Sequence, residues 1–225
     1  MTLPPIYADT PVDLLPAQSV ATFPANTFLE NLAVLPSGDL YITNHEVGEV
    51  LQLKSDGRLR VYAQVPGKVS GIAWIQPDQF LVNGWNVTGI PFIAVISDGE
   101  VQFLHMLPEA QFLNGITPLS GNRYLMADSY RGMIWSFDLA TQAIQPWLEH
   151  DLLTRSDEAS PFPAVNGLKR FGNSLYASNT QRMLLLKIPL NESLSPQEPE
   201  VFMAGTNVDD FAFDHHGNLY GATHV

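Results

Sequence analysis

The sequence predicts an all-β fold of the β-propeller type, and three observations lead to this prediction. Five segments share a polar start, a short apolar run, a turn and a second apolar run. These segments recur about 40 to 52 residues apart, which is the period of a propeller blade. Two more apolar runs follow in most repeats, and convincing amphipathic helices are absent. Four short strands per repeat are what a blade requires, and the six-bladed type is expected. The five segments begin at Glu30, Ser70, Asn114, Asn166 and Asp210.

The elements of each repeat can be assigned in order. A turn containing Gly, Asn or Asp joins the first two apolar runs, which is the pattern of a β-hairpin. These turns contain Gly38, Asp78, Gly121, Gly172 and Gly217. A third strand is expected at 49–54, 92–97, 132–138 and 182–188. A fourth is expected at 59–64, 101–106, 144–147 and 200–204. Four complete blades and one further hairpin are therefore predicted.

A single domain is expected over residues 1–225, with an N-terminal segment at 1–26 and blades one to five at 27–225. The last blade is expected to be incomplete, because the sequence stops after its second strand. Closure of the ring protects strand edges, so Gln18–Pro24 is a candidate for a strand that closes the last blade. A polar insertion at 151–164 joins two blades. Its alternatives are a lid with Phe162 pointing inward and a plain surface loop.

The composition argues against several classes of function. The chain has a formal net charge of −12, and its 11 Lys and Arg form no stripe. Neither nucleic acid nor a membrane surface is therefore an expected partner. There is no cysteine, which excludes disulfides and thiolate metal sites. No serine-nucleophile elbow or nucleotide-binding glycine loop occurs. No signal peptide or apolar run of about 18 residues is evident, and a cytoplasmic location is expected.

The polar starts of the five repeats are expected at one mouth of the central channel. The first strand of each blade lines the channel, and its start lies opposite the hairpin turns. Glu, Asn and Asp side chains offer hard oxygen ligands, which suit Ca²⁺, Mg²⁺ or Mn²⁺ better than they suit a soft metal. The alternative is that these residues only cap strand ends. The pair His215-His216 falls in a hairpin at the far end and is interpreted as a solvated turn.

From about Thr27 to its end, the chain resembles the family of senescence marker protein, gluconolactonase and luciferin-regenerating enzyme. The matching motifs are Phe28-Leu29-Glu30-Asn31, Asn114-Gly115, Asn166-Gly167-Leu168 and Asp210 followed by Gly217-Asn218-Leu219-Tyr220. The resemblance implies a divalent metal, most often Ca²⁺, with Mg²⁺, Mn²⁺ or Zn²⁺ as alternatives. It implies the metal ligands Glu30, Asn166, Asp210 and Asn114.

The same resemblance implies hydrolysis of a small lactone or ester. The metal would polarise the carbonyl group and activate water. Asp210 would accept the proton and Asn114 would orient the substrate or water. Sugar-lactonase members carry an Arg two residues before the middle Asn, where this chain has Phe112. A weakly polar substrate is therefore expected.

Several alternatives stay open at this stage. Asp209 is an alternative to Asp210 as a ligand, because neighbours on a strand point to opposite sides. Two other function classes remain: a non-enzymatic binding or scaffold propeller with a structural metal, and a strictosidine synthase-like member. Residues that end second strands are further candidates for acid or base chemistry, namely His45, Asp128, Asn179 and His224.

Overall fold

The computed structural model describes residues 18–223, so His224 lies outside the described residues. The described chain divides into two compact units. The N-terminal unit lies within Pro11–Glu109 and the C-terminal unit within Ala110–Val225. Each unit is described by itself below.

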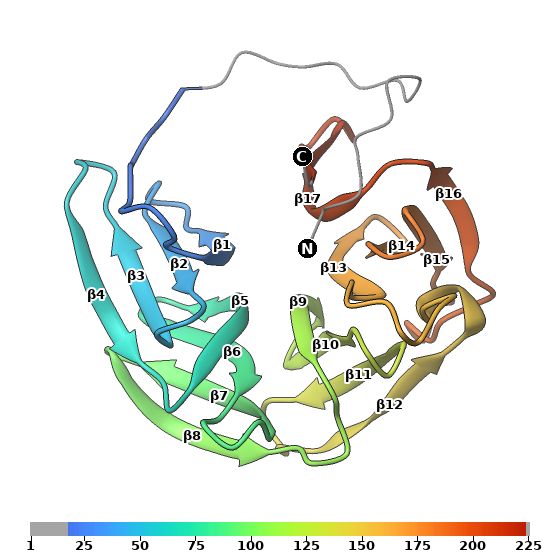
Figure 1. The fold of residues 1–225 in the computed structure, drawn as a ribbon, viewed down its shortest axis with the longest axis horizontal. Coiled ribbons are helices and arrows are strands. Elements are labelled where there is room, and N and C mark those ends of the chain that lie inside the picture. The colour runs from blue at the N-terminus through green and yellow to red at the C-terminus, as the bar shows by residue number, and fades with distance from the viewer. Residues whose placement is uncertain (1–17, 224–225) are drawn as a thin grey trace. The chain divides into compact units, whose positions relative to one another are not determined.

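The N-terminal unit consists of two four-stranded antiparallel sheets with the sequential strand order of propeller blades (Figure 1). The first sheet contains β1 (Leu29–Val34), β2 (Leu40–Asn44), β3 (Glu49–Leu53) and β4 (Leu59–Gln64). The second contains β5 (Lys68–Gln76), β6 (Gln79–Trp85), β7 (Pro91–Ser97) and β8 (Glu100–Met106).

The C-terminal unit contains two more four-stranded sheets and one hairpin. The third sheet contains β9 (Leu113–Ser120), β10 (Arg123–Asp128), β11 (Met133–Asp138) and β12 (Ile144–Glu149). The fourth contains β13 (Val165–Phe171), β14 (Ser174–Asn179), β15 (Leu184–Pro189) and β16 (Glu200–Ala204). The hairpin pairs β17 (Val208–Phe213) with β18 (Leu219–Thr223). A short 3₁₀ helix, η1 (Asp151–Leu153), lies in the insertion between the third and fourth sheets.

The predicted all-β propeller fold is confirmed, with four complete blades. The predicted hairpin turns are present, and each central residue has the positive φ that glycine tolerates without strain. Asp78 adopts the same conformation with φ 54° where the other turns carry glycine. The idea that Gln18–Pro24 forms a strand is wrong. Instead, Phe23 packs beside a small apolar cluster of Ile42, Leu51 and Leu53.

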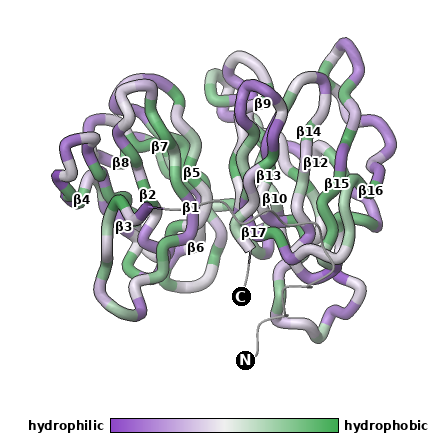
Figure 2. Tube along the Cα trace, turned by 90° about the horizontal axis from the view of Figure 1, so that it is seen from above, coloured by the Kyte–Doolittle hydropathy of each residue, from purple (hydrophilic) through white to green (hydrophobic). Residues whose placement is uncertain are grey.

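The core of each unit is formed by apolar side chains on the middle strands. In the N-terminal unit, Tyr41, Phe80 and Phe92 are almost completely buried in one cluster. In the C-terminal unit, Leu125 and Leu175 belong to a corresponding cluster. Figure 2 shows apolar residues along β7, which is buried, whereas the outer strands β4 and β16 are largely exposed. This distribution is typical of blades that pack face to face, with their fourth strands at the rim.

A bulge of the same kind occurs in the first strand of every sheet. In each case two residues of the first strand lie opposite one residue of the second strand. In three sheets a polar side chain of that opposite residue accepts the hydrogen bond of the second bulge residue. Thr43 accepts from the backbone nitrogen of Asn31 at 2.8 Å, and Ser178 accepts from that of Gly167 at 2.8 Å. Asn83 plays the same part in the second sheet.

The bulges determine which polar residues of the repeats are in phase. The first bulge positions are Glu30, Ser70, Asn114, Asn166 and Asp209. The second bulge positions are Asn31, Gly71, Gly115, Gly167 and Asp210. In the fifth repeat it is therefore Asp209, and not Asp210, that corresponds to the polar residue of the other repeats.

Candidate functional site

The C-terminal unit brings three of these first bulge residues into a row. The inner strands β9, β13 and β17 pack side by side, and they carry Asn114, Asn166 and Asp209. Two glycines permit the close approach of these strands. A β-carbon on Gly115 would lie 2.5 Å from the carbonyl oxygen of Asn166. A β-carbon on Gly167 would lie 2.5 Å from Asp210 Oδ1. In each Asn-Gly pair, the Asn thus supplies a polar side chain, and the Gly after it leaves room for the backbone of the next inner strand.

Asn166 and Asp209 make direct contact at the centre of this row. The side-chain nitrogen Nδ2 of Asn166 donates to Asp209 Oδ1 at 2.6 Å and to Thr180 Oγ1 at 3.0 Å. Asn114 and Asn166 are both buried, with 3% and 4% of their surface exposed. The polar ends of Asn166 and Asp209 therefore converge on one point. Turning the Asn166 amide over would direct its oxygen to the same point.

Asp210 has different partners from Asp209. Its carboxylate forms an ion pair with Lys169, with Nζ at 2.6 Å from Oδ1 and 2.8 Å from Oδ2. Oδ1 also accepts the backbone hydrogen bond of Phe211 at 2.9 Å. Both carboxylate oxygens are therefore engaged by a neighbouring cation. This arrangement neutralises the charge that a metal ion would otherwise use.

Glu30 occupies the equivalent first bulge position of β1, in the N-terminal unit. Its role as a ligand stays a prediction from the sequence. Within residues 18–223, no cluster of three or more His, Cys, Asp or Glu side chains is arranged to hold a metal ion. A site in the C-terminal unit would thus rely on amide oxygens together with the carboxylate of Asp209. Such a set of oxygen donors fits a hard divalent cation.

The described residues that were predicted to end second strands, His45, Asp128 and Asn179, have structural partners. Asp128 is fully buried and accepts from the backbone nitrogens of Gln111 and Phe112 and from Trp135 Nε1. His45 is also buried, and its Nδ1 donates to the carbonyl oxygen of Val69 at 2.9 Å. Burial lowers the pKa of His45 from its ordinary value.

The hydrogen bond of His45 belongs to a repeated link between neighbouring blades. Ser129 and Thr180 follow the second strands of their own blades as His45 does. Their hydroxyl groups donate to the carbonyl oxygens of Val165 and Val208, at the start of the next inner strand. This equivalence favours a structural role for His45. Its ring also packs against Trp85, which lines a cavity of about 540 Å³ together with Glu46 and Lys68.

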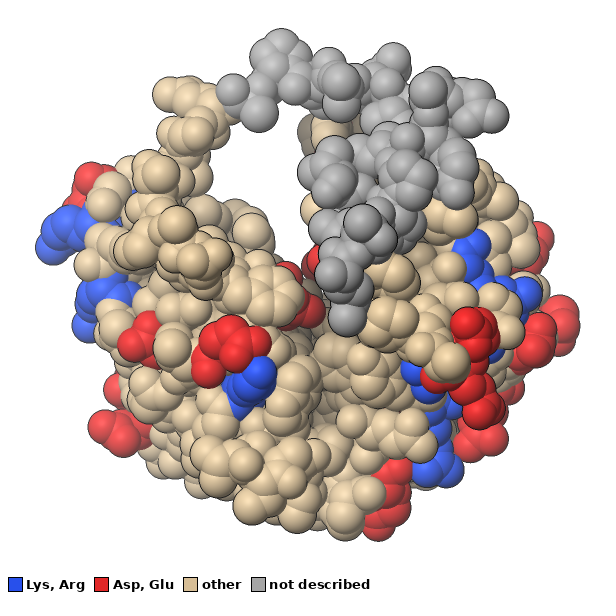
Figure 3. All heavy atoms as spheres, viewed as in Figure 1, with Lys and Arg blue, Asp and Glu red and all other residues tan. Residues whose placement is uncertain are grey.

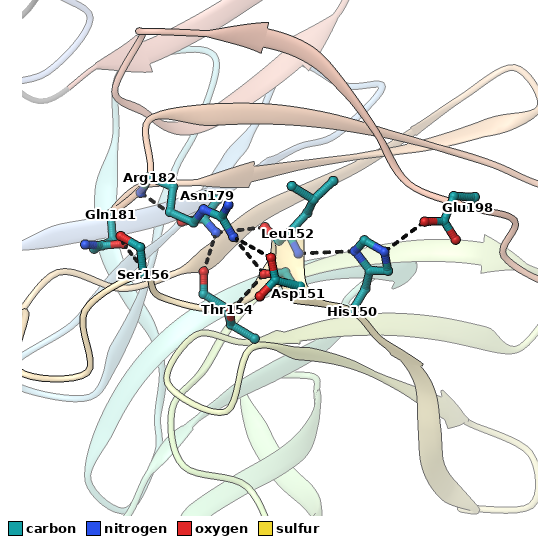
Figure 4. Close-up of polar contacts among 9 residues, drawn as sticks. All are labelled: His150, Asp151, Leu152, Thr154, Ser156, Asn179, Gln181, Arg182 and Glu198. Carbon is teal, nitrogen blue, oxygen red and sulfur yellow. Dashed lines mark hydrogen bonds and ion pairs between the residues drawn. The ribbon is translucent and has the colours of Figure 1, made fainter.

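The insertion at 151–164 is anchored to the turn that follows β14 (Figure 4). Asn179 Nδ2 donates to the carbonyl oxygens of Leu152 and Thr154, both at 2.9 Å. Gln181 Oε1 accepts from the backbone nitrogen of Ser156 at 3.0 Å. At the start of this segment, His150 pairs with Glu198 and Arg182 pairs with Asp151. Asn179 is therefore an anchor for the insertion, a role that its position at a strand end did not indicate.

His215 and His216 lie exposed in the β17–β18 turn, as predicted. On the face drawn in Figure 3, the basic side chains of the described residues are scattered among acidic ones and form no continuous patch. No helix within the described part of the chain is long and apolar enough to span a membrane.

Comparison with known proteins identifies relatives by structure only. No family model and no curated protein matches the sequence. The chain is similar to virginiamycin B lyase from Staphylococcus aureus, with a TM-score of 0.66 and 12% identity over 89% of this chain and 65% of the lyase. It is similar to a luciferin-regenerating enzyme, with a TM-score of 0.64 and 13% identity over 88% of this chain and 69% of that enzyme.

A third similar structure is regucalcin from Agrobacterium tumefaciens, described as a calcium-binding protein. Its TM-score is 0.63, with 17% identity over 88% of this chain and 68% of regucalcin. At these identities the similarity shows the propeller fold, and the chain spans 65% of the length of the S. aureus lyase.

Proposed function

We propose that this chain is a metal-dependent hydrolase of small lactones or esters, with its site at the row of Asn114, Asn166 and Asp209. The observation that carries the proposal is the 2.6 Å contact between Asn166 and Asp209, which come from the bulges of adjacent inner strands. Asn166 is buried and hydrogen-bonded to Thr180 as well, so its amide is held in one orientation next to the Asp209 carboxylate. Similarity to a calcium-binding protein and to a luciferin-regenerating enzyme supports a small-molecule site on this fold.

The acidic ligand from the fifth repeat differs from the one expected from the sequence. We assign Asp209 in place of Asp210, because Asp209 is in phase with the other bulge residues and contacts Asn166. Asp210 keeps its ion pair with Lys169 and helps to seat β17 against β13. In this proposal Asn166 and Asp209 hold a divalent cation, for which Ca²⁺ is the first candidate. The cation would act as a Lewis acid toward a carbonyl group.

The residues of the chain supply positioning and proton transfer. Asn114 is buried next to the Asn166 strand, so its amide is suited to orient the carbonyl oxygen or the attacking water. Asp209 is the carboxylate of the row, and it is the proton acceptor in this proposal. Without a bound cation, its hydrogen bond to Asn166 holds the carboxylate in one direction.

The test compares the two adjacent carboxylates. Thermal melts are recorded with chelator and with Ca²⁺, Mg²⁺ or Mn²⁺ for the parent protein, Asp209→Asn, Asn166→Ala and the matched control Asp210→Asn. A cation at a hundredfold excess over its Kd stabilises the native state by about 2.7 kcal/mol. We expect this stabilisation in the parent and in Asp210→Asn, and not in the other two variants.

Hydrolysis is then measured with a panel of lactones and aryl esters. Activity that chelator removes and Asp209→Asn abolishes would support the proposal. If Asp210→Asn loses metal binding and Asp209→Asn keeps it, Asp210 is the ligand, as predicted from the sequence. A metal that stabilises a protein without hydrolytic activity would favour the binding or scaffold alternative. No effect of any of the three metals on the parent would refute the metal site.

A further inference from the structure

The insertion at 151–164 presents a guanidinium group that stacks on Tyr130, and Tyr130 in turn contacts Phe112 just before β9. Arg155 stacks on the ring of Tyr130, with its Cζ atom 4.6 Å from the ring centroid. One of its terminal nitrogens donates to the carbonyl oxygen of Ser160 at 2.9 Å. Within residues 18–223 Arg155 has no ion pair, whereas Lys169 and Arg182 each bind a carboxylate. Most of its hydrogen-bond donors are thus available to a ligand.

The position of Arg155 is fixed from both sides. The carbonyl oxygen of Thr154 accepts from Asn179, and the backbone nitrogen of Ser156 donates to Gln181 (Figure 4). Thr154 also packs tightly on Gly132, where a β-carbon would lie 2.7 Å from the Thr154 Cα. A cation held in place before binding loses little conformational entropy when it binds an anion.

The aromatic support of Arg155 is continuous with the start of β9. The Tyr130 ring contacts the ring of Phe112 with 5.0 Å between centroids, and Phe112 lies two residues before Asn114. The Tyr130 hydroxyl donates to the carbonyl oxygen of Pro161 at 3.1 Å, which ties the far end of the insertion to the same ring.

A chain of hydrogen bonds through Ser129 connects this region to both asparagine strands. The backbone nitrogen of Ser129 donates to the carbonyl oxygen of Phe112 at 2.8 Å. Its hydroxyl donates to the carbonyl oxygen of Val165, the residue before Asn166. Ser129 and Tyr130 therefore connect the starts of β9 and β13 to the ring on which Arg155 stacks.

We propose that Arg155 binds an anionic group, a carboxylate or a similar oxyanion, of the small molecule taken by this site. This inference rests on the proposed function for the location of the ligand. It changes the expected substrate from a weakly polar lactone or ester to one that carries a negative charge. Phe112 and Tyr130 then serve as the aromatic support that holds the guanidinium, because arginine stacks well on aromatic faces.

The experiment measures equilibrium binding of three probes by calorimetry: succinate, its uncharged analogue succinamide, and inorganic phosphate. The proteins are the parent, Arg155→Met, Arg155→Lys and Arg58→Met. The last is a control that removes the same charge from an exposed ion pair with Asp56. Each titration is run with Ca²⁺ and with chelator, so that anion binding to a metal is separated from binding to Arg155. Thermal melts verify that each variant is folded.

We expect the parent and Arg58→Met to bind succinate at least about tenfold more tightly than succinamide, in chelator as well. Arg155→Met should lose this preference, and Arg155→Lys should retain part of it because the charge remains without the planar fork. Phosphate binding that follows succinate across the variants would show that the site takes oxyanions in general. Equal succinate affinity in the parent, Arg155→Met and Arg58→Met would overturn the proposal, as would a parent that does not prefer succinate.

The two proposals fail separately. Anion binding that depends on Arg155 in a protein that hydrolyses no ester would contradict the hydrolase function and keep the role of Arg155. If metal-dependent hydrolysis is lost in Asp209→Asn and Arg155→Met does not change the preference for anions, the hydrolase function is supported and the role of Arg155 is contradicted.

Discussion

The close approach of β13 and β17 at Gly167 leads to a sharp prediction for Gly167→Ala. The new β-carbon would lie 2.5 Å from Asp210 Oδ1 and 2.8 Å from the carbonyl oxygen of Asp209. The second of these atoms belongs to the backbone, so it moves only if β17 moves. Overpacking of this kind typically costs about 1–3 kcal/mol, and we expect about 2 kcal/mol. The clash also displaces Asp209, so the affinity for a metal should fall in the same variant.

The measurement is urea unfolding followed by tryptophan fluorescence, with Gly221→Ala as the matched control. Gly221 lies in β18 of the same hairpin, and a β-carbon there would contact only side chains, the nearest being Val208 Cγ1 at 3.4 Å. This control should change the free energy of unfolding by no more than about 0.5 kcal/mol. Equal unfolding midpoints for the two variants would refute the view that the glycine is required for strand contact.

Three further predictions concern contacts between and within the blades. Because burial lowers the pKa of His45 below 6.5, the folded protein binds fewer protons than the unfolded chain just below that pH. Its contribution to the free energy of unfolding is complete above pH 6.5 and falls at lower pH by at most about 1.4 kcal/mol per unit. Urea unfolding from pH 7.5 to 5 should show a flatter dependence in His45→Asn, and an unchanged slope would contradict this reasoning. Asn179→Ala removes the anchor of the insertion, so limited proteolysis should cleave 151–164 faster than in the parent, and an unchanged rate would argue against an anchoring role. Ser178→Ala leaves the backbone nitrogen of Gly167 and the carbonyl oxygen of Asp209 without this hydroxyl, and denaturation should show a loss of about 1–3 kcal/mol; a neutral result would mean that water replaces the hydroxyl.

Much of the fold was predictable because it depends on local patterns. The hairpin turns were visible as Gly, Asn or Asp between apolar runs, and Gly38 and Gly217 indeed adopt positive φ. The third and fourth strands were found within a few residues of their predicted bounds. These features follow from hydrophobic alternation and turn chemistry, which act over a few residues.

The position of the bulge in each inner strand was not predictable from the intervals between repeats. The interval from the first bulge residue to the turn glycine varies from six residues, between Asn166 and Gly172, to eight, between Glu30 and Gly38. Asp209 and Asp210 therefore fit the repeat equally well on the sequence. Their roles are distinguished by strand pairing and by contacts with Asn166 and Lys169, which lie more than 40 residues away.

The sequence by itself determined the repeat and the strands, since these depend on residue type and on intervals along the chain. Only the tertiary structure decided which acid contacts Asn166, and that Arg155 stacks on Tyr130, which contacts Phe112. The physical reason is that a bulge shifts the side-chain alternation by one residue, and a loop places its charge through hydrogen bonds to a distant turn. Both depend on partners that packing brings together, and neither leaves a regular pattern in the sequence.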